Sequence, residues 1–411
     1  MQIIISGGGI GGLTAALALQ ARGHEVTVLE AVREPKPLGV GINLLPHAVG
    51  VLSGLGLLPA LREMAVETSA LVFANRHGQP IYRDPRGLGG GYAHPQFSIH
   101  RGQLQMRLWA EAAAKLTVIS GQRVVNVRDE GRRAIAEIEA ADGPREMTAD
   151  LVIGADGIHS ALRRRLAPDE GPPCWRGVMM WRGTTWAPPF LDGRTMVQAG
   201  YSQAKFVVYP IGAPRADGLQ LINWIADRRV REPVPGLTAP DRADWSRAGR
   251  LDDLMPTFGR WRFDWLDVPG LITRAEQMLE WPMVDRDPLP RWQLGRSTLL
   301  GDAAHPMVPI GSNGATQAIM DAQALAEALA EALASGADLD AALAAYENER
   351  RPQCARIVEM NRREGLDAIL DRVEALAPEG FTRLEDVIDP AEVAREINSY
   401  KAAAGHRVQG A

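Results

Sequence analysis

The chain has 411 residues, of which 46% are hydrophobic and 23% are charged, and its formal net charge is −5. This length and composition are ordinary for a globular protein with a large core, and they exclude collagen, a coiled coil and wholesale disorder. The acidic balance argues against a protein that coats nucleic acid or an anionic membrane.

The first 30 residues predict a strand–helix–strand unit. Residues 2–6 are a β-branched run typical of a buried strand, residues 13–22 are strong helix formers with an apolar face, and residues 25–30 predict a second strand. A glycine-rich turn at residues 7–12 stands between the first strand and the helix. This context makes a glycine motif informative about ligand binding.

Three glycines of this turn, Gly7, Gly9 and Gly12, have the spacing of a dinucleotide-binding motif. The first allows a tight turn, the second lets a pyrophosphate approach the backbone, and the third lets the helix pack against the sheet. Glu30 ends the second strand, where a carboxylate accepts hydrogen bonds from a ribose and disfavours the 2′-phosphate of NADP. We therefore predict a dinucleotide site rather than a purely structural turn, and these residues do not separate NAD from FAD.

Elements further along the chain alternate between helices and short strands. We expect helices over residues 48–64 and 102–114, a hairpin over 71–82, and strands over 117–119, 124–127, 134–138 and 151–153.

Residues 172–282 differ in composition from the rest of the chain. Short β-like runs alternate there with proline and glycine turns, which predicts a mostly antiparallel sheet inserted into the α/β domain. Tryptophans gather in the same region; we expect most of them to fill the core, although such a set also suits a flat aromatic ligand. They are Trp175, Trp181, Trp186, Trp224, Trp245, Trp261, Trp265 and Trp281.

The α/β pattern returns after the insertion. A buried strand is predicted over 297–300, followed by long helices over 315–334 and 341–359. We expect part of the polar tail, residues 378–411, to be flexible.

Two more motifs end predicted strands. Gly154-Ala155-Asp156-Gly157 follows the strand at 151–153, and Gly301-Asp302 follows the strand at 297–300. Together with the glycine turn they make three signatures in order. The chain thereby resembles the group A flavoprotein monooxygenases of the para-hydroxybenzoate hydroxylase class.

Four further segments are similar to those of the methylphenazine-carboxylate monooxygenases within that class. The similarity covers about residues 1–360 and fades in the tail. The segments are residues 37–43, 98–102, 181–183 and 281–290.

The resemblance implies an α/β fold with three parts. A discontinuous Rossmann-type FAD-binding domain would comprise residues 1–70, 96–171 and 283–345. An inserted, mostly antiparallel β-sheet domain for the substrate would comprise residues 71–95 and 172–282. A C-terminal helical segment would comprise residues 346–411.

The resemblance also implies a set of FAD contacts. Asp302 would hydrogen-bond the ribityl chain, Arg101 and Gln105 would hold the phosphates, and Val124 would contact the adenine side. The turn at Asp156 and Gly157 would serve both FAD and the nicotinamide donor. The full expected set is Gly7, Gly9, Gly11, Gly12, Glu30, Gly41, Ile42, Arg101, Gln105, Val124, Asp156, Gly157, Asp302, Pro306, Gly311, Asn313, Gly314 and Ala315.

The implied activity is hydroxylation of an aromatic or N-heteroaromatic substrate by a flavin C4a-hydroperoxide, with FAD, O2 and NADH or NADPH. A carboxylate substrate could lose CO2 after hydroxylation. An NAD(P)H-oxidising flavin reductase or dehydrogenase without oxygen insertion, or a flavoprotein sensor, stays open as an alternative. A halogenase is disfavoured because residues 261–265 lack the WxWxIP pattern, and a disulfide reductase because no cysteine pair is present.

The substrate contacts and the catalytic base are the least readable part of the sequence. Tyr209, Trp224 and Pro306 are candidate substrate contacts, and Pro306 is expected to wall the flavin ring. No side chain is identified as a base; His305 and Tyr209 are the candidates, and core packing is the commoner role of each.

The cysteines and the N-terminus bear on compartment and partners. Cys174 and Cys354 stand far apart without CxxC or metal-like spacing, so we expect neither a disulfide scaffold nor a metal site. No signal peptide and no apolar run of about 20 residues is found, which predicts a cytoplasmic protein. The expected partners are a small aromatic substrate and O2, with no nucleic acid or membrane, and a homodimer is one assembly that the resemblance allows.

Overall fold

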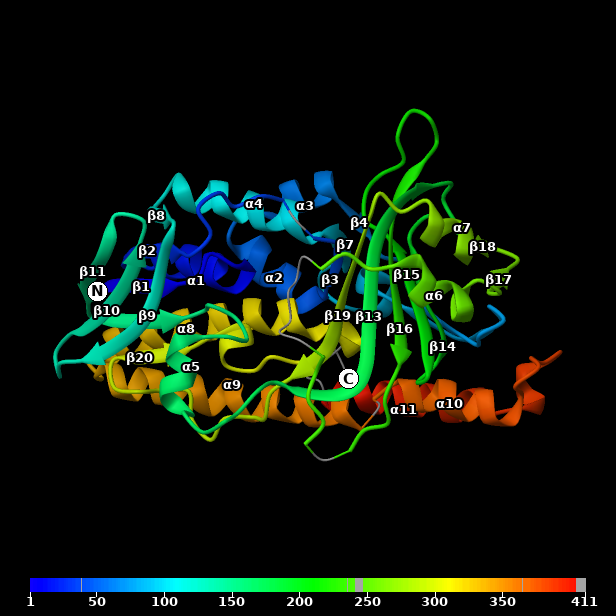
Figure 1. Cartoon of the computed structure of the whole chain (residues 1–411). Helices are drawn as coiled ribbons and strands as arrows, with labels where there is room; N and C mark the ends of the chain where they lie inside the picture. Colours follow the sequence, from blue (N-terminus) through cyan, green and yellow to red (C-terminus); the bar gives the residue numbers. More distant parts are fainter. Residues whose placement is uncertain (38, 235, 241–246, 364, 404–411) are drawn as a thin grey trace.

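The computed structural model describes residues 1–411 except 38, 235, 241–246, 364 and 404–411, so Trp245 and the end of the tail lie outside the described residues. One half of the molecule is built on a parallel sheet and the other on a seven-stranded sheet (Figure 1). Among the residues described, no helix is both long enough and apolar enough to cross a membrane.

The parallel sheet brings the three motif-bearing strands next to one another. Its strand order is β20-β12-β1-β2-β8, and all of its pairs are parallel. The three central apolar strands carry the β-branched runs that burial on both faces requires. The strands are β1 (Gln2–Ser6), β2 (Glu25–Glu30), β8 (Thr117–Ser120), β12 (Leu151–Gly154) and β20 (Ser297–Leu299).

The seven-stranded sheet confirms the expected inserted domain. Its order is β19-β13-β16-β15-β14-β5-β6, and every pair is antiparallel except β14 with β5. The hairpin predicted over 71–82 forms as β5 and β6. The strands are β5 (Ala70–Ala74), β6 (Pro80–Pro85), β13 (Cys174–Ala187), β14 (Thr195–Tyr201), β15 (Ala204–Pro210), β16 (Gln220–Arg229) and β19 (Gln277–Asp285).

Three smaller sheets complete the strands of the residues that the structure describes. One is an antiparallel sheet of β9 (Gln122–Asp129), β10 (Ala134–Ala140) and β11 (Gly143–Ala149). The others are β3 (Gly41–Leu44), β7 (Phe97–His100) and β4 (Ala65–Glu67), and the pair β17 (Arg262–Phe263) and β18 (Leu266–Asp267).

Of the helices predicted from the sequence, the one over residues 48–64 differs from the structure. The helix predicted over 48–64 is two helices, because the chain turns at Gly56, whose φ of +82° is in the left-handed region. The tail to residue 403 is largely helical, and Val393 and Ile397 are fully buried. The helices are α1 (Ile10–Gln20), α2 (Pro46–Gly54), α3 (Leu58–Met64), α4 (Arg101–Ala113), α5 (Ala161–Leu166), α6 (Leu251–Phe258), α7 (Val268–Thr273), α8 (Asn313–Ser335), α9 (Leu339–Arg362), α10 (Asp367–Leu376) and α11 (Pro390–Ala403).

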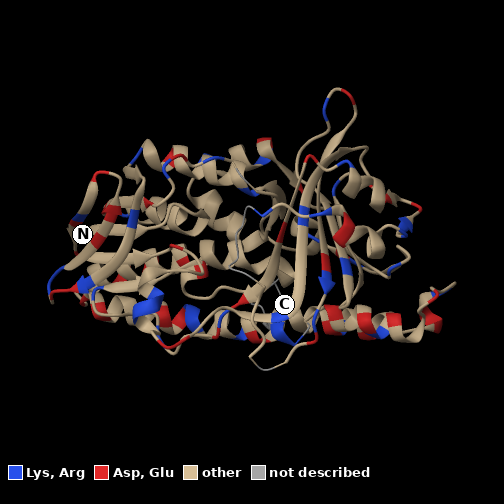
Figure 2. Cartoon of the chain, viewed as in Figure 1, with Lys and Arg blue, Asp and Glu red and all other residues tan. Residues whose placement is uncertain are grey.

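The C-terminal helices α9, α10 and α11 run beneath both halves of the molecule (Figure 1). Acidic and basic residues are interspersed along them (Figure 2). Asp367 at the start of α10 accepts hydrogen bonds from Lys205 and Gln198 of the seven-stranded sheet, at 2.5 and 2.6 Å. Within the tail, Val393, Ile397 and Tyr400 of α11 pack on this sheet, so α11 is part of the folded structure. The expectation that part of the tail is flexible stays a prediction.

A buried ionic cluster joins α8 and α9 to the turn after β20. Asp321 accepts hydrogen bonds from Arg350 at 2.9 Å and from the backbone of Gly301 at 3.0 Å, and its carboxylate lies 2.5 Å from the His305 ring. Burial alone would raise the pKa of Asp321, but His305 and Arg350 lower it to about 2. The carboxylate thus stays ionised and holds the turn that carries Asp302.

Replacing Arg350 with methionine tests this cluster. Removal of one partner of a buried ion pair leaves the other poorly compensated, so we expect Arg350→Met to lower the free energy of unfolding by about 3 kcal/mol. Urea unfolding at neutral pH measures it. The matched control is Arg107→Met, because Arg107 pairs with Glu111 at the surface, where a loss of about 0.5 kcal/mol is expected. Equal losses in both variants would contradict the role of the cluster.

Candidate functional site

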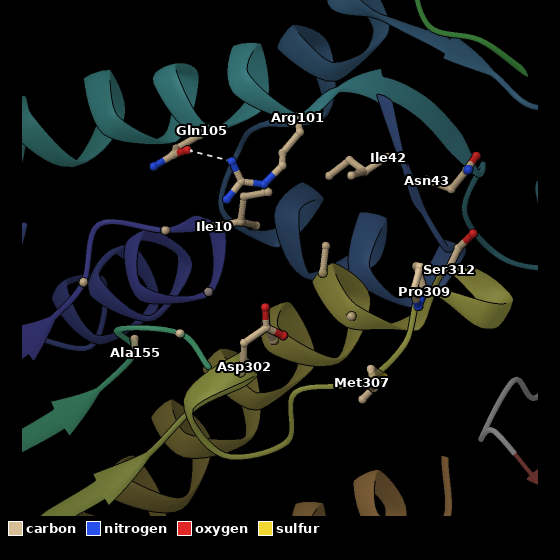
Figure 3. Close-up of a pocket in the computed structure, with 18 of the residues that line it drawn as sticks. Ile10, Ile42, Asn43, Arg101, Gln105, Ala155, Asp302, Met307, Pro309 and Ser312 are labelled. Carbon is tan, nitrogen blue, oxygen red and sulfur yellow. Dashed lines mark hydrogen bonds between the residues drawn. The ribbon is translucent and has the colours of Figure 1, made fainter. Parts of the chain in front are cut away.

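A cavity of about 840 Å³ lies between the carboxyl edge of the parallel sheet and one face of the seven-stranded sheet. All three sequence motifs reach it. Figure 3 shows Arg101 and Gln105 reaching into this space from α4 and Asp302 projecting from the turn after β20. The expected residues that line it are Gly7, Gly9, Gly11, Gly12, Glu30, Ile42, Arg101, Gln105, Val124, Asp156, Gly157, Asp302, Gly311, Gly314, Ala315 and Tyr209.

The glycine turn between β1 and α1 needs its glycines for close packing. A Cβ on Gly7, whose φ is +111°, would lie 2.4 Å from the carbonyl oxygen of Ala155, and a Cβ on Gly12 would lie 2.1 Å from that of Gly7. A Cβ on Gly9 would meet no described atom within 4 Å. The middle glycine thus leaves backbone open to the cavity at the N-terminus of α1, where N–H groups attract phosphate.

Side chains from two other elements hold this turn. Glu30 Oε2 accepts a hydrogen bond from the backbone of Gly8 at 2.7 Å, and Gln105 Nε2 donates to the Gly8 carbonyl at 2.8 Å. Arg101 Nη1 donates to Gln105 Oε1 at 3.3 Å (Figure 3). A carboxylate, an amide and a guanidinium therefore line the same end of the cavity, a donor and acceptor set suited to a ribose and a pyrophosphate.

The turn after β12 presents an incompletely bonded carboxylate. Asp156 Oδ2 accepts from the backbone of Ala161 at 2.9 Å, while its buried Oδ1 has no hydrogen-bond partner within the described part of the chain. Burial raises the pKa of Asp156. Buried polar atoms are nearly always paired, so this oxygen is free to meet a ligand that enters the cavity.

The loop before α8 forms part of the cavity wall. Gly311 and Ser312 have φ values of +70° and +58°, and this left-handed pair precedes the first turn of α8. Gly314 and Ala315 line the cavity at that helix end, where backbone N–H groups favour negative charge. Pro309 lines the cavity (Figure 3). The predicted Pro306 is buried and does not line it.

The seven-stranded sheet supplies an apolar floor with a few charged groups. Alternate residues of β15, Lys205, Val207 and Tyr209, face the cavity. Tyr209 donates a hydrogen bond to the Gly41 carbonyl at 2.9 Å, and Arg182 donates to the same oxygen. The apolar residues of the floor are Leu71, Met180, Met196, Val207, Ile225, Trp281 and Met283.

Charge in this floor is largely compensated. Lys205 lies 2.5 Å from Asp367 and 3.7 Å from Asp227, and all three side chains are nearly buried. Burial raises the pKa of Asp227 to about 6, with the charge of Asp367 adding to the rise and Lys205 and Arg182 opposing it. Asp227 is therefore a cavity carboxyl whose charge changes near pH 6.

Four expected residues do not line the cavity. Trp224 is on the opposite face of the sheet, fully buried and stacked on Phe206, because neighbouring residues of a strand alternate between faces. Gly41 packs behind the wall, where a Cβ would lie 2.7 Å from Ile211. The side chain of Asn313 is buried beneath α8. Pro306 is buried outside the cavity, as described above.

His305 belongs to the ionic cluster rather than to the cavity. Its ring is buried against Asp321, and its pKa is raised well above the ordinary value because Cys354 and Asp321 outweigh the effect of burial. His305, Asp321 and Cys354 are the one group of candidate metal ligands among the residues described, and Arg350 already supplies a cation there. The geometry therefore fits a core-packing role for His305 rather than the role of a catalytic base.

Several cavity residues were missed by the sequence analysis. The alternation of Lys205, Val207 and Tyr209 in one strand was a usable signal for a shared face. Arg182 lies in the similar segment 181–183 but was given no role, and nothing in the local sequence pointed to Asp227 or to the contributions of the tail. From the tail, Leu366, Ile397, Tyr400 and Lys401 line the cavity.

Comparisons with known proteins agree with this geometry. The chain matches the family described as FAD binding domain over residues 1–361. It is 45% identical over 370 residues to phenazine 1,6-dicarboxylic acid hydroxylase of Lysobacter antibioticus, covering 88% of this chain and 89% of that protein. It is 30% identical over 384 residues to 3-hydroxybenzoate 6-hydroxylase of Klebsiella oxytoca, covering 89% and 88%.

A solved structure shares the fold. That of Klebsiella pneumoniae HpxO complexed with FAD and uric acid superposes with a TM-score of 0.76 at 24% identity, covering 97% of this chain and 96% of that one. The predicted α/β architecture, with its Rossmann-type sheet, inserted sheet domain and C-terminal helices, is confirmed. The three motifs at one sheet edge and the match over residues 1–361 lead to one conclusion: the chain belongs to the FAD-binding-domain family of aromatic hydroxylases.

Proposed function

We propose that this protein hydroxylates a polycyclic N-heteroaromatic carboxylate: NADH or NADPH supplies two electrons as a hydride, one atom of O2 enters the product and the other leaves as water. Its class is that of the FAD-dependent aromatic monooxygenases, and its cofactor is FAD. The observation that carries the proposal is the continuity of the cavity, which joins the three motifs to the apolar sheet face in one space of about 840 Å³. Ligand pockets range over roughly 300–1,000 Å³.

The residues present fit FAD. The unpaired Oδ1 of Asp156, the open position at Gly9 and the carboxylate of Asp302 in the cavity are all unexplained by the protein's own contacts. We propose that Glu30 binds the adenosine ribose, the N-terminus of α1 the pyrophosphate, and Asp302 the ribityl hydroxyls. Bound FAD supplies hydride acceptance and oxygen activation.

The chain's own side chains orient the substrate and exclude water. Met180, Met196 and Trp281 present flat or flexible apolar surface to an aromatic ring. Tyr209 is buried and its pKa is raised by burial, although Arg182 opposes the rise, so its hydroxyl stays neutral and donates to Gly41. Tyr209 is therefore proposed as a positioning residue rather than a base.

The proposed substrate class rests on two of the relatives described above and on the chemistry of the cavity. The relative from Lysobacter antibioticus acts on phenazine 1,6-dicarboxylic acid, and the one from Klebsiella oxytoca on 3-hydroxybenzoate. An apolar floor with cationic side chains at its borders suits a ring that bears carboxylate. A homodimer, a cytoplasmic location and the absence of nucleic-acid and membrane partners stay predictions.

A substrate panel tests the function. Phenazine-1-carboxylate, phenazine-1,6-dicarboxylate, 3-hydroxybenzoate and phenazine are incubated with the FAD-loaded protein, and NAD(P)H oxidation and product mass are recorded. We expect a carboxylated phenazine to stimulate oxidation and to yield a product that carries one added oxygen, with or without loss of CO2. Oxidation that yields only H2O2 with every compound would favour the flavin reductase alternative.

Asp302 is the residue whose loss should release the cofactor. Asp302→Ala removes the carboxylate proposed to bind the ribityl chain, and charged hydrogen bonds contribute about 1.5–3 kcal/mol each. We expect the purified variant to lose most of its flavin absorbance. Asp264→Ala is the matched control, because Asp264 is exposed on the far side of the sheet domain. A fully yellow Asp302→Ala protein would reject the assignment.

Asp227 should make substrate binding depend on pH. Its pKa of about 6 means that the cavity gains a negative charge as the pH rises through that value. The dissociation constant of phenazine-1-carboxylate should therefore increase by up to about tenfold between about pH 5 and pH 7. Titration of the flavin spectrum measures it. Asp227→Asn should abolish the step while leaving neutral phenazine binding unchanged; a step that persists in this variant would assign it to another group.

A further inference from the structure

One end of the cavity is lined by polar side chains that the proposed function does not use. Arg86 directly follows β6, Gln96 directly precedes β7, and Lys401 lies in the last turn of α11. Arg86 and Gln96 lie ten residues apart, and the fold brings Lys401, from the far end of the chain, to them. We refer to Arg86, Gln96 and Lys401 as the edge cluster.

The edge cluster carries an excess of positive charge. Asp84 in β6 forms a hydrogen bond with Lys401, and its other oxygen lies 3.0 Å from Arg86. Side-chain exposures are 14% for Lys401, 11% for Arg86 and 3% for Asp84. Two cations therefore share one carboxylate, and Asp367, the neighbouring acid on α10, is bound by Lys205. One unit of positive charge is left facing the cavity.

The edge cluster also has unmet hydrogen-bonding capacity. Arg86 Nε and Gln96 Oε1 are buried and have no hydrogen-bond partner across the ranges that the structure describes. Gln96 is only 2% exposed. An amide side chain can present either its oxygen or its nitrogen, and buried polar atoms are nearly always paired in a finished site. A ligand oxygen would accept a hydrogen bond from Arg86 Nε, and one from Gln96 when its amide turns the nitrogen toward the ligand.

Apolar surface adjoins the edge cluster. Leu71 and Met196 line the same cavity and are register partners on the adjacent strands β5 and β14, and β5 pairs with β6 on its other side. A ring lying on this floor can thus extend a substituent toward Arg86. The substituent that best matches a guanidinium fork and an ammonium is a carboxylate.

We propose that the edge cluster is an anion subsite that takes a carboxylate group of the aromatic substrate. This inference rests on the proposed function for the ring itself. A bound carboxylate balances the excess charge and accepts from Arg86 and Lys401 at once, while Asp84 holds the two cations in place. Because Lys401 lies beyond residue 361, where the family match ends, the subsite gives this chain a specificity element outside the matched region.

The experiment compares carboxylated and neutral ligands in charge variants of the FAD-loaded protein. Dissociation constants of phenazine-1-carboxylate, phenazine-1,6-dicarboxylate and phenazine are obtained from the perturbation of the flavin absorption spectrum. We expect Arg86→Met to weaken the tighter-binding carboxylate by about tenfold or more, with neutral phenazine nearly unchanged. Lys401→Met should also weaken carboxylate binding. It replaces Arg86→Met as the test variant if Arg86→Met loses flavin or melts at a lower temperature.

Asp84→Asn provides a test of opposite sign. It removes the carboxylate that competes for both cations at almost constant volume, so carboxylates should bind more tightly than in the wild type. Arg83→Met is the matched control, because Arg83 is an exposed arginine on the same strand that pairs with Asp192 outside the cavity. It should change none of the three constants.

Two results would overturn the subsite. One is an equal effect of Arg86→Met and Lys401→Met on phenazine and on its carboxylates, which would mean that these cations only neutralise Asp84. The other is weaker carboxylate binding in Asp84→Asn. Failure of the proposed function is distinguishable from both, because it would appear in the wild type as ligand binding without an oxygenated product.

Discussion

Parallel pairing of β1, β12 and β20 is the constraint on which the site depends. Ser6 pairs with Gly154, and Gly154 with Leu299, so the three strands end side by side. Carboxyl ends of parallel strands lie at the same edge of a sheet, and ligands of open α/β sheets bind outside that edge. The glycine turn, Asp156 and Asp302 therefore face one space although long stretches of chain separate them.

The seven-stranded sheet forms the second wall of the cavity at that edge. Its two faces have different neighbours. One face packs its aromatic core, including Trp224 and Phe206, against α6 and α7. The other face presents Val207 and Tyr209 to the cavity, together with Lys205, whose charge is balanced by Asp227 and Asp367. A charge inside such a floor is tolerated only when it is paired, which explains why the acids and bases there come in clusters.

The C-terminal helices connect the halves physically. Tyr400 of α11 donates a hydrogen bond to Asn361 of α9 at 3.0 Å, and Asn361 in turn donates to the Val308 carbonyl in the loop before α8. Lys401 bonds to Asp84 of the sheet domain. A segment that the sequence presents as a polar tail thus contacts both the loop before α8 and the edge strand β6 of the seven-stranded sheet.

Local sequence was sufficient for the elements and for the cofactor motifs. The β-branched run of β1, the glycine spacing and the strand-ending Asp156 and Asp302 are local patterns, and the Rossmann-type unit and the dinucleotide site were predicted from them. The inserted sheet was predicted from the short β-like runs and turns of residues 172–282. The face on which a residue lies and its long-range partners are set by strand register and by packing between distant segments. For that reason Trp224 and Pro306 were misplaced, while Arg182, Asp227 and the edge cluster became visible only once the chain was folded.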